Sequence, residues 1–111
     1  MDPEWREAGV ISSDDCVFCA IASHSAPARE VLRTSDMVAF FPDEPAVLGH
    51  VLVIPVRHVE LVYDLDASTA GALAFATVRV ARAVRDTFAP AGMNIVQSNG
   101  PAATQTVPHV H

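Results

Sequence analysis

The sequence predicts an α+β domain with a mainly antiparallel sheet, one long helix and one short N-terminal helix. Three patterns predict this class: a hairpin-like region at 31–41, a continuous β-branched run at 50–54, and a long helical period at 64–89. The chain has 111 residues, half of them hydrophobic and 18% charged. This length and composition indicate one folded globular domain rather than a disordered chain.

The first residues carry the weakest pattern. Residues 1–14 lack periodicity and are expected to form a flexible N-terminal arm. From Cys16 to about Ala22 a short apolar stretch could form one or two helical turns. Asp14 and Asp15 stand ahead of it, where an acidic side chain suits an N-cap and the positive end of the helix dipole. Pro27 is expected to end this segment.

Three strands are predicted next. Val31–Arg33 and Met37–Phe41 are short apolar runs, and the Thr34–Asp36 stretch between them consists of turn-forming residues, which indicates a hairpin. His50–Ile54 is apolar and rich in β-branched residues, which predicts a central strand buried on both faces. Pro55 is expected to close that strand.

Asp64–Ala89 is the strongest predicted helix. Asp66 or Ser68 could cap its start, and Pro90 would stop it. Alanines along the helix would allow close approach of a second subunit, although alanine is also simply a good helix former. Residues at three- or four-residue spacing define its apolar face: Leu73, Thr77, Val80, Val84 and Phe88.

The last part of the chain is expected to add one strand and begin another. Met93–Ser98 is predicted as a strand, and residues 99–101 as a turn. A loop of small residues follows at 102–106. Val107–His111 alternates enough to begin a final strand, with which the sequence stops.

Charge and hydropathy exclude several partners. The net charge is −6 and all seven basic residues are arginine, so there is no basic patch for duplex nucleic acid. No apolar run reaches the ~20 residues of a membrane span, and the acidic start does not resemble a secretory signal. We therefore expect a cytoplasmic protein that binds neither duplex nucleic acid nor membranes.

Two pairs of residues could carry chemistry. His109 and His111 are two residues apart, so on a strand both imidazoles would point to the same face. Taken alone, this pair fits a metal pair or chance better than catalysis. Cys16 and Cys19 form a Cys-x-x-Cys motif, which in a reducing compartment indicates a metal or redox site more than a structural disulfide.

Four segments occur together in a characteristic order: Cys16–Cys19, Ala39–Asp43, Gly49–His58 and Gln105–His111. They resemble the histidine triad (HIT) family, and specifically its branch of small nucleotide-phosphoramidate hydrolases. The last two segments together are highly specific, since the family motif is His-φ-His-φ-His-φ-φ, with φ apolar. The resemblance covers residues 15–111 and implies a HIT-like fold, a homodimer, and a hydrolase or transferase of purine nucleotide derivatives.

The resemblance implies that His111 is the nucleophile, because it matches the middle histidine of the motif. Its neutral imidazole would attack the α-phosphorus, expel an amine, alcohol or acyl group, and leave a nucleotidyl-histidine that water hydrolyses. Its other nitrogen would need an acceptor to fix the tautomer, usually a backbone carbonyl. Gln105 and Thr106 match the pair that faces the phosphate, where backbone N–H groups would stabilise developing charge.

The resemblance also implies a nucleotide pocket. Asp43 matches the carboxylate that binds the ribose hydroxyls, and His50 matches a histidine that lines the pocket. Ser98, with Asn99 beside it, stands where the family contacts the phosphate or the leaving group. Apolar candidates for the base pocket, each as consistent with plain core packing, are Phe18, Ile21, Phe40 and Phe41.

Cys16, Cys19, His58 and His109 form a second set. Two thiolates and two imidazoles are a usual tetrahedral zinc set, and some bacterial HIT proteins hold zinc at the matching positions. The resemblance therefore implies a structural Zn²⁺ without an open coordination position, and no organic cofactor. The metal would hold His109 beside His111. The alternative is two reduced, buried cysteines and two ordinary histidines.

Several positions depart from the family pattern. The third histidine of the triad would fall two positions after His111, so the C-terminal end of the domain is expected to be incomplete. The family usually has Asn at Ser98 and Gly at Thr104, where a Cβ could narrow the approach to the phosphate. The loop from Asp43 to His50 is one residue shorter than usual. These differences bear on substrate choice and turnover rather than on the fold.

Three functions compete at this point. The predicted one is a nucleotidyl hydrolase or transferase for purine nucleoside monophosphate derivatives, with cleavage of dinucleoside polyphosphates as a close variant. The second is a nucleotide-binding, zinc-stabilised interaction module with little catalysis. The third is a thiol redox protein at Cys16 and Cys19, which is disfavoured because the motif does not follow a strand as in thioredoxin-like proteins.

Overall fold

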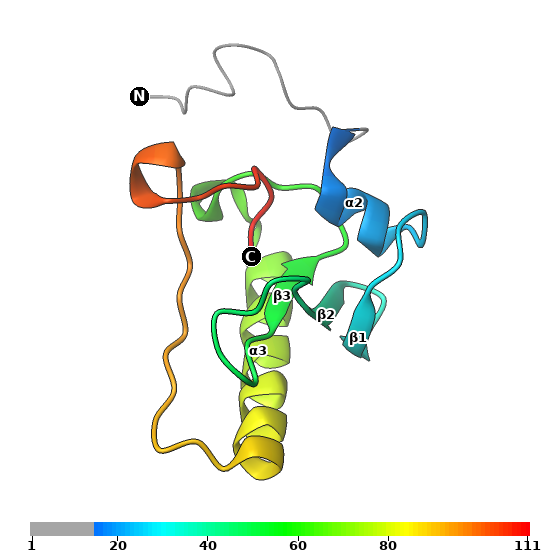
Figure 1. Cartoon of the computed structure of the whole chain (residues 1–111). Coiled ribbons are helices and arrows are strands. Elements are labelled where there is room, and N and C mark those ends of the chain that lie inside the picture. Colours follow the sequence, from blue (N-terminus) through cyan, green and yellow to red (C-terminus); the bar gives the residue numbers. More distant parts are fainter. Residues whose placement is uncertain (1–14) are drawn as a thin grey trace.

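The computed structural model describes residues 15–111 (Figure 1). Its elements in chain order are α2 (Val17–Ala22), β1 (Arg29–Arg33), β2 (Met37–Phe41), β3 (Leu52–Pro55), the 3₁₀ turn η2 (Val62–Asp64), α3 (Ala67–Phe88) and the 3₁₀ turn η3 (Pro101–Ala103). The predicted α+β class is confirmed, with an antiparallel sheet, one long helix and one short helix. The arm predicted at 1–14, and Asp14 as an N-cap, lie outside the described residues.

The sheet has the order β1-β2-β3, and both pairings are antiparallel. The predicted hairpin is confirmed, with Arg29 opposite Phe41 and an irregularity between Glu30 and Leu32. The prediction of a central strand at 50–54 is wrong in two respects. The strand runs from Leu52 to Pro55, and it lies at an edge of the described sheet because only β2 pairs with it. The middle strand is β2 instead, and four of its five residues are buried.

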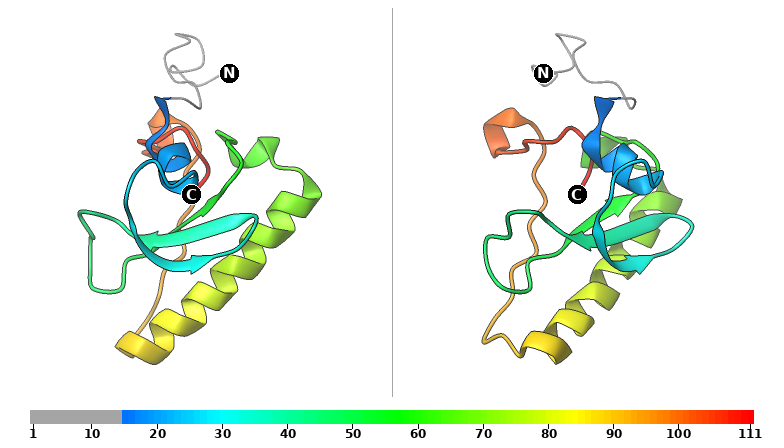
Figure 2. Two further views of the ribbon diagram at one scale, coloured as in Figure 1. Left: turned by 90° about the vertical axis from the view of Figure 1, so that its right-hand side faces the viewer. Right: turned by 45° about the vertical axis from the view of Figure 1, so that its right-hand side comes forward.

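Helix α3 crosses the sheet and packs on β2 and β3 through one face, on which Ala76 and Val80 are buried (Figures 1 and 2). It begins at Ala67, because the Asp66 side chain caps it by accepting the Thr69 backbone N–H at 2.7 Å. It ends at Phe88, where Ala89 adopts a left-handed conformation with φ 46°. The prediction of Asp66 as a cap is confirmed.

Helix α2 seats its apolar side chains on the sheet. Its N-cap is Cys16, whose sulfur accepts the Cys19 backbone N–H at 3.4 Å, so Asp15 does not cap the helix as predicted. The helix ends at Ala22, ahead of Pro27. Its buried residues join those of β2 and β3 in one core cluster: Cys16, Phe18, Ile21, Ala22, Val38, Phe40 and Ile54.

Two predicted strands do not form in the described residues. The segment Met93–Ser98 runs apart from the sheet without a strand assignment, and Ile95 and Val96 are 68% and 75% exposed (Figure 1). A β-branched sequence becomes a strand only when a neighbour accepts its hydrogen bonds, and no described residue pairs with this one. Val107–His111 bends instead, because the His109 N–H donates to the Val107 carbonyl two residues earlier at 2.8 Å.

The last residues are nevertheless held firmly. The Val110 N–H donates to the Val59 carbonyl at 2.7 Å, and His109 and Val110 are fully buried. The C-terminal segment therefore lies against the loop that follows β3. Within the described part of the chain, no helix is both long and apolar enough to cross a membrane.

Candidate functional site

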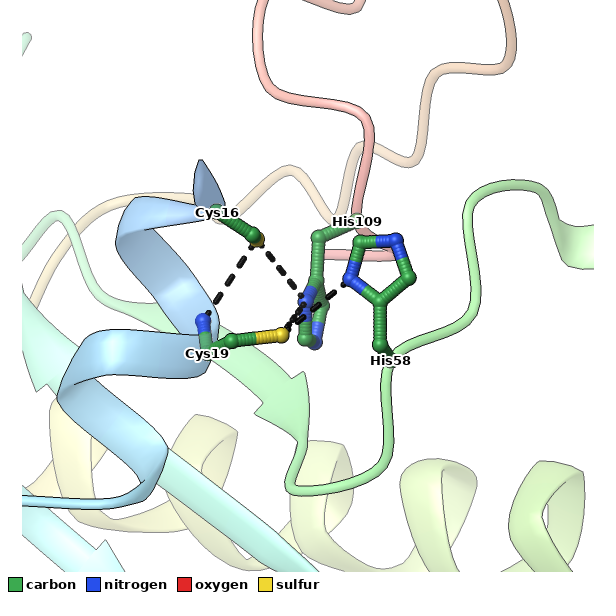
Figure 3. Close-up of side chains that lie close together, drawn as sticks. All are labelled: Cys16, Cys19, His58 and His109. Atoms are coloured by element: carbon green, nitrogen blue, oxygen red, sulfur yellow. Dashed lines mark hydrogen bonds between the residues drawn. The ribbon is translucent and has the colours of Figure 1, made fainter. Parts of the chain in front are cut away.

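The four predicted metal ligands come together from three separate segments (Figure 3). Cys16 and Cys19 come from the start of α2, His58 from the loop after β3, and His109 from the C-terminal segment. The Cys19 sulfur lies 3.1 Å from His58 Nδ1 and 3.6 Å from His109 Nδ1, and the Cys16 sulfur lies 3.4 Å from His109 Nδ1. All four ligand atoms lie within 4.8 Å of one another.

Local structure explains why these side chains face one another. The i, i+3 spacing in the first turn of α2 places both thiols on one side of the helix. On the opposite side of the cluster, His109 Nε2–H donates to the Pro55 carbonyl at 2.8 Å. A carbonyl is only an acceptor, so the proton sits on Nε2 and the Nδ1 lone pair faces the thiols.

The residues present fit a zinc ion. Bonds of ~2.3 Å to sulfur and ~2.0–2.1 Å to nitrogen in a tetrahedron place sulfur and nitrogen ligand atoms about 3.5 Å apart. The three sulfur–nitrogen separations here are 3.1, 3.4 and 3.6 Å. Neither cysteine forms a disulfide. The chemistry and spacing of the donors therefore match a tetrahedral Cys₂His₂ metal site.

Burial keeps His109 in the neutral form that a metal ligand needs. The pKa of His109 is lowered to about 4, mainly by desolvation and further by His58 and His111, while the Pro55 hydrogen bond opposes the shift. At neutral pH its imidazole is uncharged. His109 can therefore donate a nitrogen lone pair without first losing a proton.

His111 has the hydrogen bond that a histidine nucleophile requires. Its Nδ1–H donates to the backbone carbonyl of His109 at 2.8 Å, so the lone pair is on Nε2. The ring is half-buried and lies edge-to-face with Phe18, at a centroid distance of 5.0 Å. The predicted strand is absent, yet the His109 ring also contacts Phe18, at 5.8 Å, so both imidazoles meet the same aromatic ring.

The Gln105 side chain holds the loop before His111 in place through hydrogen bonds. This side chain is 3% exposed; its oxygen accepts the Gly100 N–H at 2.7 Å, and its nitrogen donates to the carbonyls of Glu60 and Val107 at 2.8 and 3.1 Å. Thr106, next in sequence, is exposed. Thr104 adopts the left-handed conformation, with φ 69°. The amide of Gln105 is thus bonded within the protein, whereas the hydroxyl of Thr106 reaches solvent.

The predicted nucleotide-binding residues lie on several segments. Asp43 is exposed on the β2–β3 loop, and His50 is half-buried there with Nδ1 accepting the Ala46 N–H at 3.0 Å. Ser98 is half-buried beside Asn99, whose side-chain oxygen accepts the Val62 N–H at 2.8 Å. Among the aromatic and apolar candidates, Phe18, Ile21 and Phe40 are buried in the core and Phe41 is half-buried.

Two contacts were not foreseen in the sequence. The Pro55 carbonyl orients His109, and Phe18 touches His111 rather than only the core. The position of Phe18 inside the Cys-x-x-Cys motif could have suggested its closeness to the cluster, whereas a backbone carbonyl leaves no signal in the sequence.

The fold is that of a small α+β protein, and the cluster is a possible metal site close to His111. The HIT domain model matches residues 23–111. The chain belongs to the HIT family.

Two relatives align with most of this chain, and the aligned part makes up 58% to 68% of their own length. "Protein hit" of Bacillus subtilis is 36% identical over 99 residues, which are 89% of this chain and 68% of that protein. Adenosine 5'-monophosphoramidase HNT1 of Saccharomyces cerevisiae is 35% identical over 98 residues, covering 86% of this chain and 58% of that protein.

One similar protein of known structure is Zn-bound. The crystal structure of a Zn-bound histidine triad family protein from Mycobacterium smegmatis is 38% identical, with a TM-score of 0.83, and covers 90% of this chain and 73% of that one. The crystal structure of a HIT family member from Bacillus subtilis gives a TM-score of 0.85 at 37% identity, over 87% of this chain and 69% of that one. These similarities bear out the predicted family and fold.

Proposed function

We propose that this protein is a nucleotide-binding hydrolase or transferase that cleaves the α-phosphate linkage of purine nucleoside monophosphate derivatives, with His111 as nucleophile. The observation that carries the proposal is the 2.8 Å hydrogen bond from His111 Nδ1–H to the His109 carbonyl, which leaves the Nε2 lone pair available. Adenosine 5'-monophosphoramidases of two yeasts are similar to this chain at 31% and 35% identity, which supports a phosphoramidate or related ester as substrate.

The proposed reaction has two steps. His111 Nε2 forms a bond to the α-phosphorus while the bond from phosphorus to the amine, alcohol or acyl group breaks, and the leaving group takes a proton. Water then attacks the phosphorus, releases the nucleoside monophosphate and returns the electron pair to Nε2. The carbonyl of His109 stabilises the imidazole as its charge rises, because the acceptor remains on Nδ1–H throughout.

Other residues would bind the nucleotide. We assign the exposed Thr106 hydroxyl to a phosphate oxygen or the leaving group, with Gln105 holding the loop behind it. Asp43 would accept hydrogen bonds from the ribose hydroxyls. The remaining assignments, which follow from the family resemblance, are His50, Phe18, Phe41, Ser98 and Asn99.

We also propose that Cys16, Cys19, His58 and His109 bind one structural Zn²⁺. With these four protein ligands the ion would have no open position, so it would cross-link three chain segments rather than supply Lewis-acid chemistry. The two cysteines suit a reducing compartment, which supports a cytoplasmic location.

A homodimer completes the proposal. The face of α3 turned away from the sheet exposes Phe75 and Val78 by 69% and 47%, and Val78 lines an apolar hollow of about 350 Å³ with Met93 and Ile95. An apolar face of this kind is more typical of a subunit contact than of a solvated surface. A second copy of this chain is the partner we propose for it.

The test uses the full chain with adenosine 5'-phosphoramidate. We expect AMP release and, in acid-quenched protein, a nucleotidyl adduct located on His111 by mass spectrometry. Both should disappear in His111→Ala and persist in His24→Asn, a change at an exposed histidine that is not one of the four cluster residues. Asparagine suits the left-handed conformation of position 24.

The other functions give different results. Cleavage of a dinucleoside polyphosphate with no release from the phosphoramidate would assign the chain to that variant. Tight AMP binding without turnover, unchanged in His111→Ala, would refute the enzyme and favour a nucleotide-binding module.

A further inference from the structure

Phe18 occupies the two-residue gap between the ligand cysteines and faces away from solvent. It is 6% exposed, and its ring meets three others edge-to-face: Phe40 at 5.7 Å, His109 at 5.8 Å and His111 at 5.0 Å. One ring thus contacts a residue of the sheet, a residue of the cluster and the proposed nucleophile. A core residue of α2 would contact the sheet without touching either histidine.

The hydrogen bond at Nδ1 restrains only one edge of the His111 ring. His111 lies in a segment without regular secondary structure, and its ring donates a hydrogen bond to the His109 carbonyl. If the ring turned about its Cβ–Cγ bond, that hydrogen bond would break and the protonated nitrogen could change. The Phe18 ring lies edge-to-face against the imidazole with an interplanar angle of 77°, a contact that would oppose this rotation.

The place of Phe18 depends in turn on the metal ligands. Helix α2 has six residues, which is too short to be stable by itself, so tertiary contacts must hold it. Those contacts are the core beneath it and the cluster at its first turn, where Cys16 and Cys19 face His58 and His109. A metal bound by the four side chains would fix the backbone of Cys16–Cys19, and Phe18 with it.

We propose that Phe18 is a positioning residue for His111, and that filling the Cys16–Cys19–His58–His109 site orders the reactive imidazole through Phe18. The proposal rests on His111 being the reactive residue. It gives Phe18 a part in addition to the nucleotide contact proposed for it, because the ring touches His111 itself.

The test reads the His111 ring directly by long-range ¹H–¹⁵N correlation spectra of the full chain, zinc-loaded and after chelation. In the zinc-loaded protein we expect one tautomer, with the proton on Nδ1. Chelation should mix the tautomers or broaden the signals. Phe18→Leu should give the mixed pattern even with zinc bound, and Phe88→Leu, at a half-buried phenylalanine of α3, should keep the single tautomer of the parent. The usual strength of an edge-to-face pair corresponds to a roughly 2- to 12-fold change in the tautomer ratio.

Further measurements distinguish a loss of His111 positioning from a loss of zinc binding or of folding. The Phe18→Leu variant should match the parent in zinc stoichiometry and in its far-ultraviolet spectrum. If the leucine variant does not fold, Phe18→Met takes its place in the experiment. A Phe18 variant whose zinc-loaded His111 keeps the single tautomer would overturn the proposal, as would a parent spectrum unaffected by chelation. The spectra need no substrate, so failure of AMP release in the parent would count against the proposed function and leave this test intact.

Discussion

Zinc should stabilise this protein strongly, because the four ligands join segments that share few other bonds. The first turn of α2, the loop after β3 and the C-terminal segment meet at the cluster. The C-terminal segment is joined to β3 and to the loop after it by hydrogen bonds from Val110 to Val59, from His109 to Pro55 and from Gln105 to Glu60. Removing the metal leaves these links and the core contacts of α2 to hold the site together.

The size of the effect follows from mass action. A ligand that binds only the folded state and is present at about 100 times its Kd adds about 2.7 kcal/mol to the free energy of unfolding. For a domain of this size each kcal/mol moves the Tm by about 4–8 °C. We therefore expect saturating zinc to raise the Tm of chelator-treated protein by roughly 10–20 °C.

The assay is thermal unfolding by circular dichroism, with zinc measured by mass spectrometry. We expect one zinc per chain. Cys19→Ser replaces one thiolate by a hydroxyl, a poor zinc ligand, and should lose most of the rise; His24→Asn should keep it. The reasoning would be refuted by a Tm that zinc does not change, or by an equal rise in Cys19→Ser.

Three further predictions concern other features. Thr104→Gly should raise the free energy of unfolding, measured in urea, by up to about 1 kcal/mol. The reason is that relief of the left-handed strain (about 1–2 kcal/mol) exceeds the entropy cost of glycine (about 0.5–1 kcal/mol). The control Thr104→Ala keeps the Cβ and should give no gain. Metal-free protein should lose about 2 kcal/mol between pH 7.5 and pH 5, since the His109 pKa of about 4 lies below its unfolded value. As the pH falls, the unfolded chain takes up a proton on His109 that the folded chain does not, so the free energy of unfolding is at its full value above about pH 6.5 and decreases towards pH 4. Equal urea midpoints at the two pH values would contradict this prediction. Phe75→Ser should shift sedimentation from dimer to monomer, while Tyr63→Ser, at an equally exposed ring of η2, should not; a parent that sediments as a monomer would remove the dimer.

Local patterns predicted most of the secondary structure. The hairpin was foreseen because a run of turn-forming residues separates two apolar runs, and α3 because its apolar period and Asp66 cap agree. Met93–Ser98 was predicted as a strand from its local composition, as the correct elements were, but here the prediction is wrong. Its composition suits a strand, but a strand also needs a neighbour at its edge, and local sequence carries no information about that neighbour.

The candidate site could be predicted as a set of residues but not as an arrangement. Spacing could not pair Cys16 with His109, which are 93 positions apart, and the family resemblance supplied that expectation. The cap of α2 was misassigned to Asp15, because acidic residues usually cap helices and a cysteine sulfur is a weak acceptor. The structure gives that sulfur two neighbours, the helix start and His109, and only the second depends on the distant chain.

His109 connects the two halves of the site through three different atoms. Nδ1 faces the thiols, Nε2–H is held by Pro55, and the backbone carbonyl holds the proton of His111. Because one buried residue makes all three contacts, a movement of its backbone would disturb the proposed metal ligands and the proposed nucleophile, His111, together. A replacement of His109 would therefore not separate the two roles, whereas Phe18→Leu keeps all four ligand side chains and changes the ring packing against His111, His109 and Phe40. That difference is why the positioning of the nucleophile is best tested at Phe18 and not at the histidine that joins both sites.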